Sequence, residues 1–458
     1  MKTSLRLVIT LSLLLFSLEL AARPAHAAPG PDPQGGVHTL RLLGCAQGAV
    51  GRAFMAENPD VQLVNLGIAL IDGQALVREL ASQDAGADIF AINAEYGLNA
   101  LKEKGFVTDL SASAVISREV ESFYPRIQDV LRRADEIIGV PESFIPSPWV
   151  INRALWSELE LGAYPASYDD YLSLQAEWRA DDDAVERYRL MTSSIGGADT
   201  RSGMMRAMIQ LYILQNEEPA EPLRFDGGAF AHAARRIREL PETRLTESSD
   251  RFFERPWAIW SDDFSPADVQ AACDLLTPPL IDGRGTPAVP AQMMVLVVNP
   301  FSAEREAAVR YLEYVVEHLE PGEVMMLSPT QNGPFLNPDW DRQAAYYREQ
   351  ADFFRGELDG LEGADARDAQ EAIALYESYL EREEGKYLIH PDVVRRYREI
   401  APYVRLNDRS DFLSHGQIGI LKMLYEIADR YLAGKLDEDA MVLEMNRRAQ
   451  MLYAEKGL

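Results

Sequence analysis

Between residues 39 and 104, short apolar runs alternate with longer stretches whose apolar residues recur at helical spacing. The short runs are typical of buried strands and lie at 39–43, 61–66 and 88–92. The helical stretches lie at 47–57, 72–82 and 96–104. This alternation predicts a mostly parallel sheet with helices on both faces, and such a sheet binds its ligands at the carboxyl ends of the strands.

Another apolar run lies far along the chain, at 293–298, and no polar residue interrupts it. An unbroken run of this kind indicates a strand buried on both faces. It is followed by Asn299-Pro300 and by a helical stretch with Leu312 and Val315 on one face. We therefore expect this distant segment to complete the first sheet.

The region from 149 to 290 mixes helical and strand-like pieces, whereas the chain after 340 is helical. In the mixed region, a helix is expected at 201–214 and a short strand at 257–260. Later helix candidates lie at 341–355, 365–381, 391–400 and 418–432, and Asp437 is placed to cap a last helix. These patterns predict an α/β protein with a helical C-terminal part.

The N-terminus has the pattern of a secretory signal peptide. Two basic residues precede an apolar stretch, and Ala25-His26-Ala27 is a typical cleavage site. We expect residues 1–27 to be a signal peptide and residues 28–38, rich in Pro and Gly, to be a flexible leader. No later segment reaches the roughly 20 apolar residues that a membrane span needs. The mature protein is therefore expected to be secreted, in the periplasm or outside the cell.

The chain is strongly acidic, with a formal net charge of -27 at pH 7. A surface of this charge repels nucleic acid and anionic membranes, so neither is expected as a partner. Only two cysteines are present, Cys45 and Cys273, so disulfides do not define the fold, and whether these two pair is left open. Cys45 lies too far beyond the apolar stretch to carry a lipid anchor.

Several short motifs occur in one order along the mature chain. They are Ala53-Phe54 with Asn58-Pro59, Ala87-Asp88-Ile89-Phe90-Ala91, Gly105 with Asp109-Leu110, Ile138-Gly139-Val140-Pro141, Pro165 with Ser167-Tyr168, Phe225-Asp226, Val298-Asn299-Pro300 and Tyr431-Leu432 with Gly434. In this order, and behind a signal peptide, they resemble the extracellular solute-binding proteins of ABC importers, carbohydrate-type family 1. Tyr168 stands where this family usually has Trp. Many members are lipoproteins, a feature that this signal peptide lacks.

The resemblance implies a two-lobed periplasmic-binding-protein type II fold with a helix-rich second lobe and a C-terminal helical extension. Lobe one is expected to comprise 39–141 and 289–335, and lobe two 142–288 and 336–458. A monomer of this family captures a small solute between its lobes, without a cofactor, and delivers it to the membrane subunits of an ABC permease. The resemblance implies a sugar or oligosaccharide, while the acidic composition leaves cationic solutes open.

An enzyme is the competing class of function. Paired carboxylates suffice for a secreted carbohydrate-active hydrolase, but among 72 Asp and Glu such pairs arise by chance. The sequence lacks a helical His-x3-His pair, a nucleophile elbow and a phosphate loop, so we expect no catalytic residue, no metal and no cofactor. Asp181-Asp182-Asp183 fits a solvated turn or a helix cap better than a calcium site. A structural protein with an acidic helical tail is a third class, although such charge is typical of a solvated face.

The candidate ligand residues follow from the expected strand ends and from the chemistry of sugar binding. Sugars present apolar faces and polar edges, so their sites combine aromatic rings with carboxylates and amides. The candidates are Gln47, Asp72, Asn93, Glu95 and Tyr96 in lobe one, Glu142, Trp260 and Asp262 in the crossing region and lobe two, and Asn332 in a late Asn-Gly-Pro turn. Two of these candidates have an alternative structural role. Asn93 is also suited to capping the next helix, and Trp260 is also suited to packing in the core together with Trp257.

Overall fold

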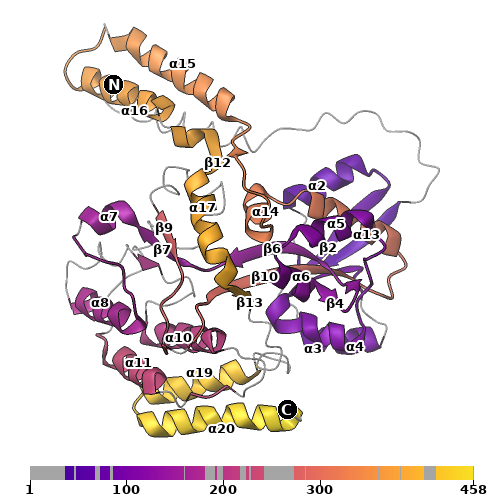
Figure 1. Cartoon of the computed structure of the whole chain (residues 1–458). Coiled ribbons are helices and arrows are strands. Elements are labelled where there is room, and N and C mark those ends of the chain that lie inside the picture. The colour runs from indigo at the N-terminus through magenta and orange to yellow at the C-terminus, as the bar shows by residue number, and fades with distance from the viewer. Residues whose placement is uncertain are drawn as a thin grey trace.

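The structure is a computed structural model, and it describes residues 37–45, 48–67, 73–82, 86–158, 160–180, 191–192, 200–216, 223–225, 228–241, 273–283, 285–358, 360–381, 383–406 and 419–456. The expected signal peptide and most of the expected leader lie outside these residues, as do Asp181 to Asp183 and the strand expected at 257–260. Two lobes lie side by side, and a pair of helices projects from them (Figure 1).

Lobe one is built on a six-stranded sheet. Its strands are β1 (His38–Leu43), β2 (Val61–Gly67), β3 (Ile89–Asn93), β6 (Val140–Pro146), β10 (Val289–Val298) and β13 (Val404–Leu406). β1 pairs in parallel with β2 and β3, whereas β10 pairs antiparallel with β3 and β6. Residues 295–298 of β10 are all buried and pair with residues 89–92 of β3. The expectation that a distant apolar run completes the first sheet is confirmed.

Helices pack around this sheet and form the lobe-one core together with it. They are α2 (Gly48–Glu57), α3 (Gly73–Ala81), the π-helical turn η1 (Ala94–Leu98), α4 (Asn99–Lys104), α5 (Ala114–Ser122), α6 (Pro125–Leu131), α13 (Arg305–Glu317) and α14 (Pro321–Leu327), with a small ribbon of β4 (Arg132–Arg133) and β5 (Glu136–Ile137). The three helices expected between 47 and 104 are present. The last ends at Gly105, which takes a left-handed φ of 70° and donates its N–H to Leu101 and Lys102, a helix ending that glycine permits without strain.

Lobe two has a three-stranded antiparallel sheet and a larger helical part. Its elements are β7 (Trp149–Asn152), α7 (Arg153–Glu158), α8 (Tyr168–Ala180), β8 (Met191–Thr192), α10 (Arg201–Gln215), α11 (Gly228–Glu239), β9 (Cys273–Leu276), α19 (Gly419–Leu432) and α20 (Glu438–Lys456). Its core contains several aromatic rings among aliphatic residues, and the ring centroids of Trp149 and Tyr171 lie 4.5 Å apart. Asp437 accepts the N–H of Ala440 at 2.8 Å, so the expected cap of the last helix is confirmed.

A helical hairpin forms a third, separate unit. It consists of α15 (Trp340–Leu358) and α16 (Ala364–Glu381), preceded by β11 (Phe335–Leu336) and followed by η4 (Glu383–Lys386) and β12 (Tyr387–Ile389). The two helices bury a small core of their own around Phe354 and Tyr376. They project away from both lobes (Figure 1). Both helices match the candidates at 341–355 and 365–381.

The chain after this hairpin packs both against the lobe-one core and against β9 of lobe two, and the expected assignment of 336–458 to lobe two stays a prediction. Helix α17 (Pro391–Ile400), the turn η5 (Ala401–Tyr403) and β13 contribute buried residues to the lobe-one core. The reason is the apolar face of α17, where Val393, Tyr397 and Ile400 pack against that core. β13 then adds to the sheet beside the start of β10. The lobe limits stay predictions.

Both cysteines are free thiols, and both are buried. Cys45 follows β1 in lobe one, whereas Cys273 begins β9 in lobe two. Burial raises the pKa of each thiol to about 12. Among the described helices, none has the length and apolar character needed to cross a membrane.

Candidate functional site

The strands that join the two lobes expose one face of the sheet at the carboxyl end of β3. β6 leads within a few residues into β7 of lobe two, and β9 of lobe two leads back into β10. Paired residues point to the same face of a sheet, and successive residues along a strand alternate between faces. Here Asn93 pairs with Met294, and Met294 also pairs with Ser143. Gln292 pairs with Ile145 in the same way.

This register places the residues of the joining strands on two faces of the sheet, and the two faces differ in character. One face, which we call the open face, carries Asn93, Ser143, Ile145, Pro290, Gln292, Met294 and Arg405. Gln292 is exposed, and the other six are half-buried. The opposite face carries Phe144, Val289, Ala291, Met293, Val404 and Leu406, all of which are buried. The side chains on the open face are therefore the ones that solvent or a solute reaches.

The open face carries little charge. Arg405 is its only charged residue, and its Nη1 donates to the main-chain carbonyls of Pro402 at 2.7 Å and Val404 at 2.9 Å. Gln292 and Ser143 supply an amide and a hydroxyl, which both donate and accept hydrogen bonds. Ile145 and Met294 supply apolar contact beside them. This combination suits a neutral, hydroxylated molecule.

A pocket of about 210 Å³ lies elsewhere, on the buried side of the same strands. Its lining includes Tyr124, Phe144, Met326, Tyr397 and Leu406, and it is mainly apolar. Four of these residues, Phe144, Met326, Tyr397 and Leu406, are buried in the lobe-one core. The pocket thus lies mainly behind the sheet, and Arg405, which the register places on the open face, also lines it.

Glu142 sits at an irregularity in the pairing of β6 with β10, where the register shifts between Met294 and Val295. Burial raises the pKa of its carboxyl to about 7. Its charge in turn contributes to the raised pKa values of the Tyr311 phenol on α13 and the Glu323 carboxyl on α14, where burial is the main cause. Glu142 is therefore within electrostatic range of both helices. As a ligand residue it remains a prediction.

The other predicted site residues divide into three groups. Asn93 lies on the open face, and Glu95 and Tyr96 lie in the π-helical turn that directly follows β3, although their side chains are outside the described part. Asn332 lies beside α17, where its Oδ1 accepts the Nε–H of Arg398 at 3.0 Å and its amide nitrogen donates to the carbonyl of Thr330 at 3.3 Å. Gln47, Asp72, Trp260 and Asp262 fall outside the described residues.

Sequence reasoning missed most of the open face. The only trace of it in the sequence is that Gln292 is a polar residue between the apolar residues Ala291 and Met293. The strand was expected to begin only at Met293, so its exposed alternate positions were left out.

Among the described residues, no group of His, Cys, Asp and Glu is arranged to hold a metal ion.

Comparison with known proteins finds similar folds but no similar sequence. No family model matches the sequence, and no curated protein matches it. Solved structures do match. The GacH receptor of Streptomyces glaucescens, studied unliganded and with acarbose, shares 12% identity at a TM-score of 0.54, covering 91% of this chain and 98% of that one.

Two further structures match similarly. Maltose-bound MalE3 of T. maritima shares 13% identity at a TM-score of 0.51, over 90% of this chain and 99% of that one. An ABC substrate-binding protein of Listeria monocytogenes in complex with cycloalternan shares 13% identity at a TM-score of 0.50, over 92% and 99%. At these identities the likeness concerns the fold, and it extends over nearly the full length of each neighbour. The chain therefore has the same two-lobed α/β fold as these three proteins.

Proposed function

We propose that this protein is the substrate-binding receptor of an ABC importer and captures a sugar or oligosaccharide between its lobes. The observation that carries the proposal is the open face, which lies on the strands that join the lobes. In a two-lobed protein, hinge closure brings both lobes around a solute bound at this junction. The fold supports the same function, since its neighbours include receptors solved with acarbose, maltose and cycloalternan.

The composition of the open face supports a neutral solute over a cationic one. No carboxylate stands among its seven residues, although the chain as a whole has a net charge of -27 and the predicted ligand residues Glu95 and Glu142 lie within two residues of Asn93 and Ser143. A cation would need a carboxylate partner at such a partly desolvated surface. A sugar needs amide and hydroxyl groups at its edges and apolar atoms against its ring. Gln292, Ser143 and Met294 provide these groups.

The further parts of the proposal follow from the receptor role. The protein acts as a monomer, outside the cytoplasmic membrane, and passes its solute to the membrane subunits of a permease without altering it. A secreted carbohydrate-active hydrolase is the alternative function. It differs in one measurable respect, because it consumes the solute that it binds.

The test is a screen of the mature chain against neutral oligosaccharides, monosaccharides and polyols, with polyamines as the cationic set. A receptor should be stabilised by one neutral solute, by about 2.7 kcal/mol when the solute is at a hundred times its Kd. Thermal unfolding detects the hit, calorimetry measures its Kd, and chromatography follows the solute over hours. Stabilisation by polyamines alone would contradict the sugar assignment, and steady loss of the bound sugar would contradict the receptor role.

A further inference from the structure

The pocket of about 210 Å³ among α6, β6, α14, α17, η5 and β13 has an apolar interior. Phe144, Met326, Tyr397 and Leu406 line it and are all buried. The phenol of Tyr397 already has a protein partner, because its hydroxyl donates to the carbonyl of Met326 at 2.9 Å. An apolar cavity accepts apolar molecules in preference to water. The interior therefore suits the apolar part of a small ligand.

The mouth of the pocket lies between α6 and η5. Pro125 at the start of α6 and Pro402 in η5 are exposed, whereas the other residues of the lining are buried or half-buried. Arg126 directly follows Pro125, and Arg405 donates through Nη1 to the carbonyl of Pro402 at 2.7 Å. Both arginines line the pocket. The mouth therefore carries two guanidinium groups.

The charge around the pocket is positive, although the whole chain has a net charge of -27. No Asp or Glu is part of the described lining. A third arginine, Arg398, donates through Nη1 to the hydroxyl of Tyr124, a lining residue, at 2.7 Å. Its other bonds go to the carbonyls of Met325 and Gln331 and to the amide oxygen of Asn332. Among the described residues, the partners of Arg398 are thus all neutral.

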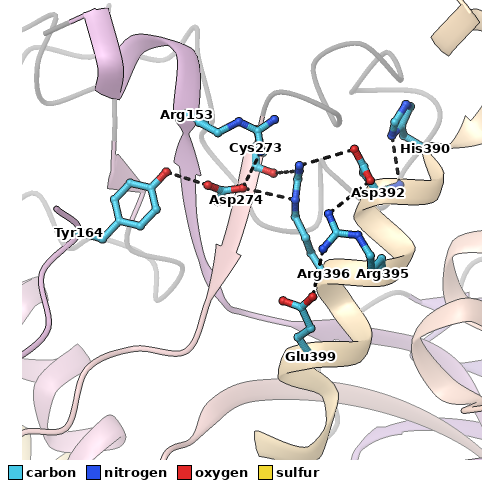
Figure 2. Close-up of polar contacts among 9 residues, drawn as sticks. All are labelled: Arg153, Tyr164, Cys273, Asp274, His390, Asp392, Arg395, Arg396 and Glu399. Carbon is cyan, nitrogen blue, oxygen red and sulfur yellow. Dashed lines mark hydrogen bonds and ion pairs between the residues drawn. The ribbon is translucent and has the colours of Figure 1, made fainter. Parts of the chain in front are cut away.

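The neighbouring arginines of α17 differ in this respect. Figure 2 shows Arg395 and Arg396 bonded to carboxylates of α17 and β9, which neutralise their charge. The charge of Arg398 has no such partner, so it adds to the positive potential at the pocket. A guanidinium has five N–H donors and can hold main-chain carbonyls and an anion together. An anionic group at the mouth would therefore be bound favourably.

The size and the lining of the pocket favour an aromatic ring. In another protein, an apolar cavity of about 150 Å³ binds benzene. A pocket of about 210 Å³ has room for one ring and a short chain. Tyr124, Phe144 and Tyr397 contribute rings to the lining, and aromatic rings attract one another in offset and edge-to-face arrangements.

We propose that this pocket is a second binding site of the protein and takes a small aromatic carboxylate. The ring of the ligand lies against Phe144 and Tyr397, and its carboxylate lies at the mouth between Arg126 and Arg405. Phe144 belongs to the buried face of β6, opposite Ser143 and Ile145 on the open face. The site is therefore distinct from the one proposed for the sugar.

The test titrates phenylacetate into the mature chain without sugar, and ligand-observed NMR measures the Kd. Phenylacetamide is the neutral probe of the same shape, and octanoate is a carboxylate without a ring. Phenylacetate should bind saturably. Phenylacetamide should bind at least about tenfold more weakly, because it lacks a hydrogen bond between charged groups. Tighter binding of octanoate than of phenylacetate would contradict the aromatic assignment.

Two variants test whether the ligand occupies this pocket. Ala401 is a buried lining residue, so Ala401→Leu fills part of the pocket and should abolish the binding of both phenyl probes. Arg126→Met removes a charge from the mouth, and it should weaken phenylacetate about tenfold while leaving phenylacetamide unchanged. Arg395→Met is the matched control, because Arg395 is 59% exposed and pairs with Asp392 and Glu399 outside the lining.

Circular dichroism and thermal unfolding report whether each variant folds. If Ala401→Leu does not fold, the comparison of Arg126→Met with Arg395→Met decides. The proposal is overturned if phenylacetate does not bind saturably, if the acid and the amide bind equally, or if folded Ala401→Leu or Arg126→Met keeps the wild-type affinity. Because no sugar is present, each of these results leaves the proposed sugar binding to be judged by its own screen.

Discussion

Glu142 is a half-buried carboxyl group whose pKa burial raises from the ordinary 4.5 to about 7. Because its pKa is higher in the folded chain than in the unfolded chain, this group lowers stability as pH rises from about 4.5 to 7. Below that window both states hold the proton, and the cost disappears. Glu142→Gln should therefore raise the free energy of unfolding by about 1 to 3 kcal/mol at pH 8 and change it little at pH 4.

Urea unfolding of the mature chain at the two pH values measures this difference. Glu121→Gln on α5 is the control, because Glu121 is exposed and its variant should behave like the wild type at both pH values. An equal gain for Glu142→Gln at pH 4 and pH 8 would show that the effect is not electrostatic. The same pH window is expected for Glu323, whose pKa burial also raises to about 7.

Gln292 is the exposed member of the open face, so its amide is available to a solute. Gln292→Ala removes one pair of hydrogen-bonding groups, and the loss of one neutral hydrogen bond costs about 1 kcal/mol, or roughly fivefold in Kd. Calorimetry with the sugar found in the screen measures the change. Gln370→Ala, at an exposed position on α16, is the matched control. Unchanged affinity in Gln292→Ala would move the binding site away from the open face.

At the scale of elements, the α15–α16 hairpin has a core separate from both lobes. Phe354 is 2% exposed and stacks on Tyr376 at a centroid distance of 6.1 Å. Phe354→Ala leaves a cavity in this small core, and such truncations cost about 3 to 5 kcal/mol. Faster amide hydrogen exchange is therefore expected across 340–381, with no change in the strands of lobe one. The adjacent Phe353 is 53% exposed, so Phe353→Ala should leave exchange in the hairpin unchanged.

If both variants accelerated exchange throughout the chain, the hairpin would be part of one cooperative unit with the lobes. Its separation in Figure 1 argues for the local result. A unit that opens locally is held by the free energy of its own core, and the core around Phe354 is small.

At the scale of the whole molecule, solute binding should change the lobe arrangement. A solute held between two lobes favours the closed form by the difference in its affinity for the two forms. Small-angle scattering of the mature chain is therefore expected to show a smaller radius of gyration with saturating sugar, and dialysis that removes the sugar should restore the original value. Identical scattering with and without a sugar that calorimetry shows to bind would place the solute on one lobe alone.

The sequence by itself determined most of the local structure, because helix and strand formation here depend on patterns within a few residues. The apolar run at 293–298 predicts a buried strand from its own composition, and that strand forms. Gly105 and Asp437 end and begin helices through their own backbone and side-chain chemistry. The family resemblance supplied the two-lobed arrangement, which the fold comparisons confirm.

Only the tertiary structure decided which distant segments meet. The amphipathic pattern of α17 shows that this helix packs but not against which elements, and only the structure brings it into contact with both the lobe-one core and β9. The open face depends on the register of β10 with β3 and β6, so Gln292 becomes a site residue only once those strands are paired. The raised pKa of Glu142 and the contact of Arg396 with Asp274 likewise arise from burial among residues far apart in the chain. Pairing and burial of this kind are properties of the folded chain, and no window of sequence contains them.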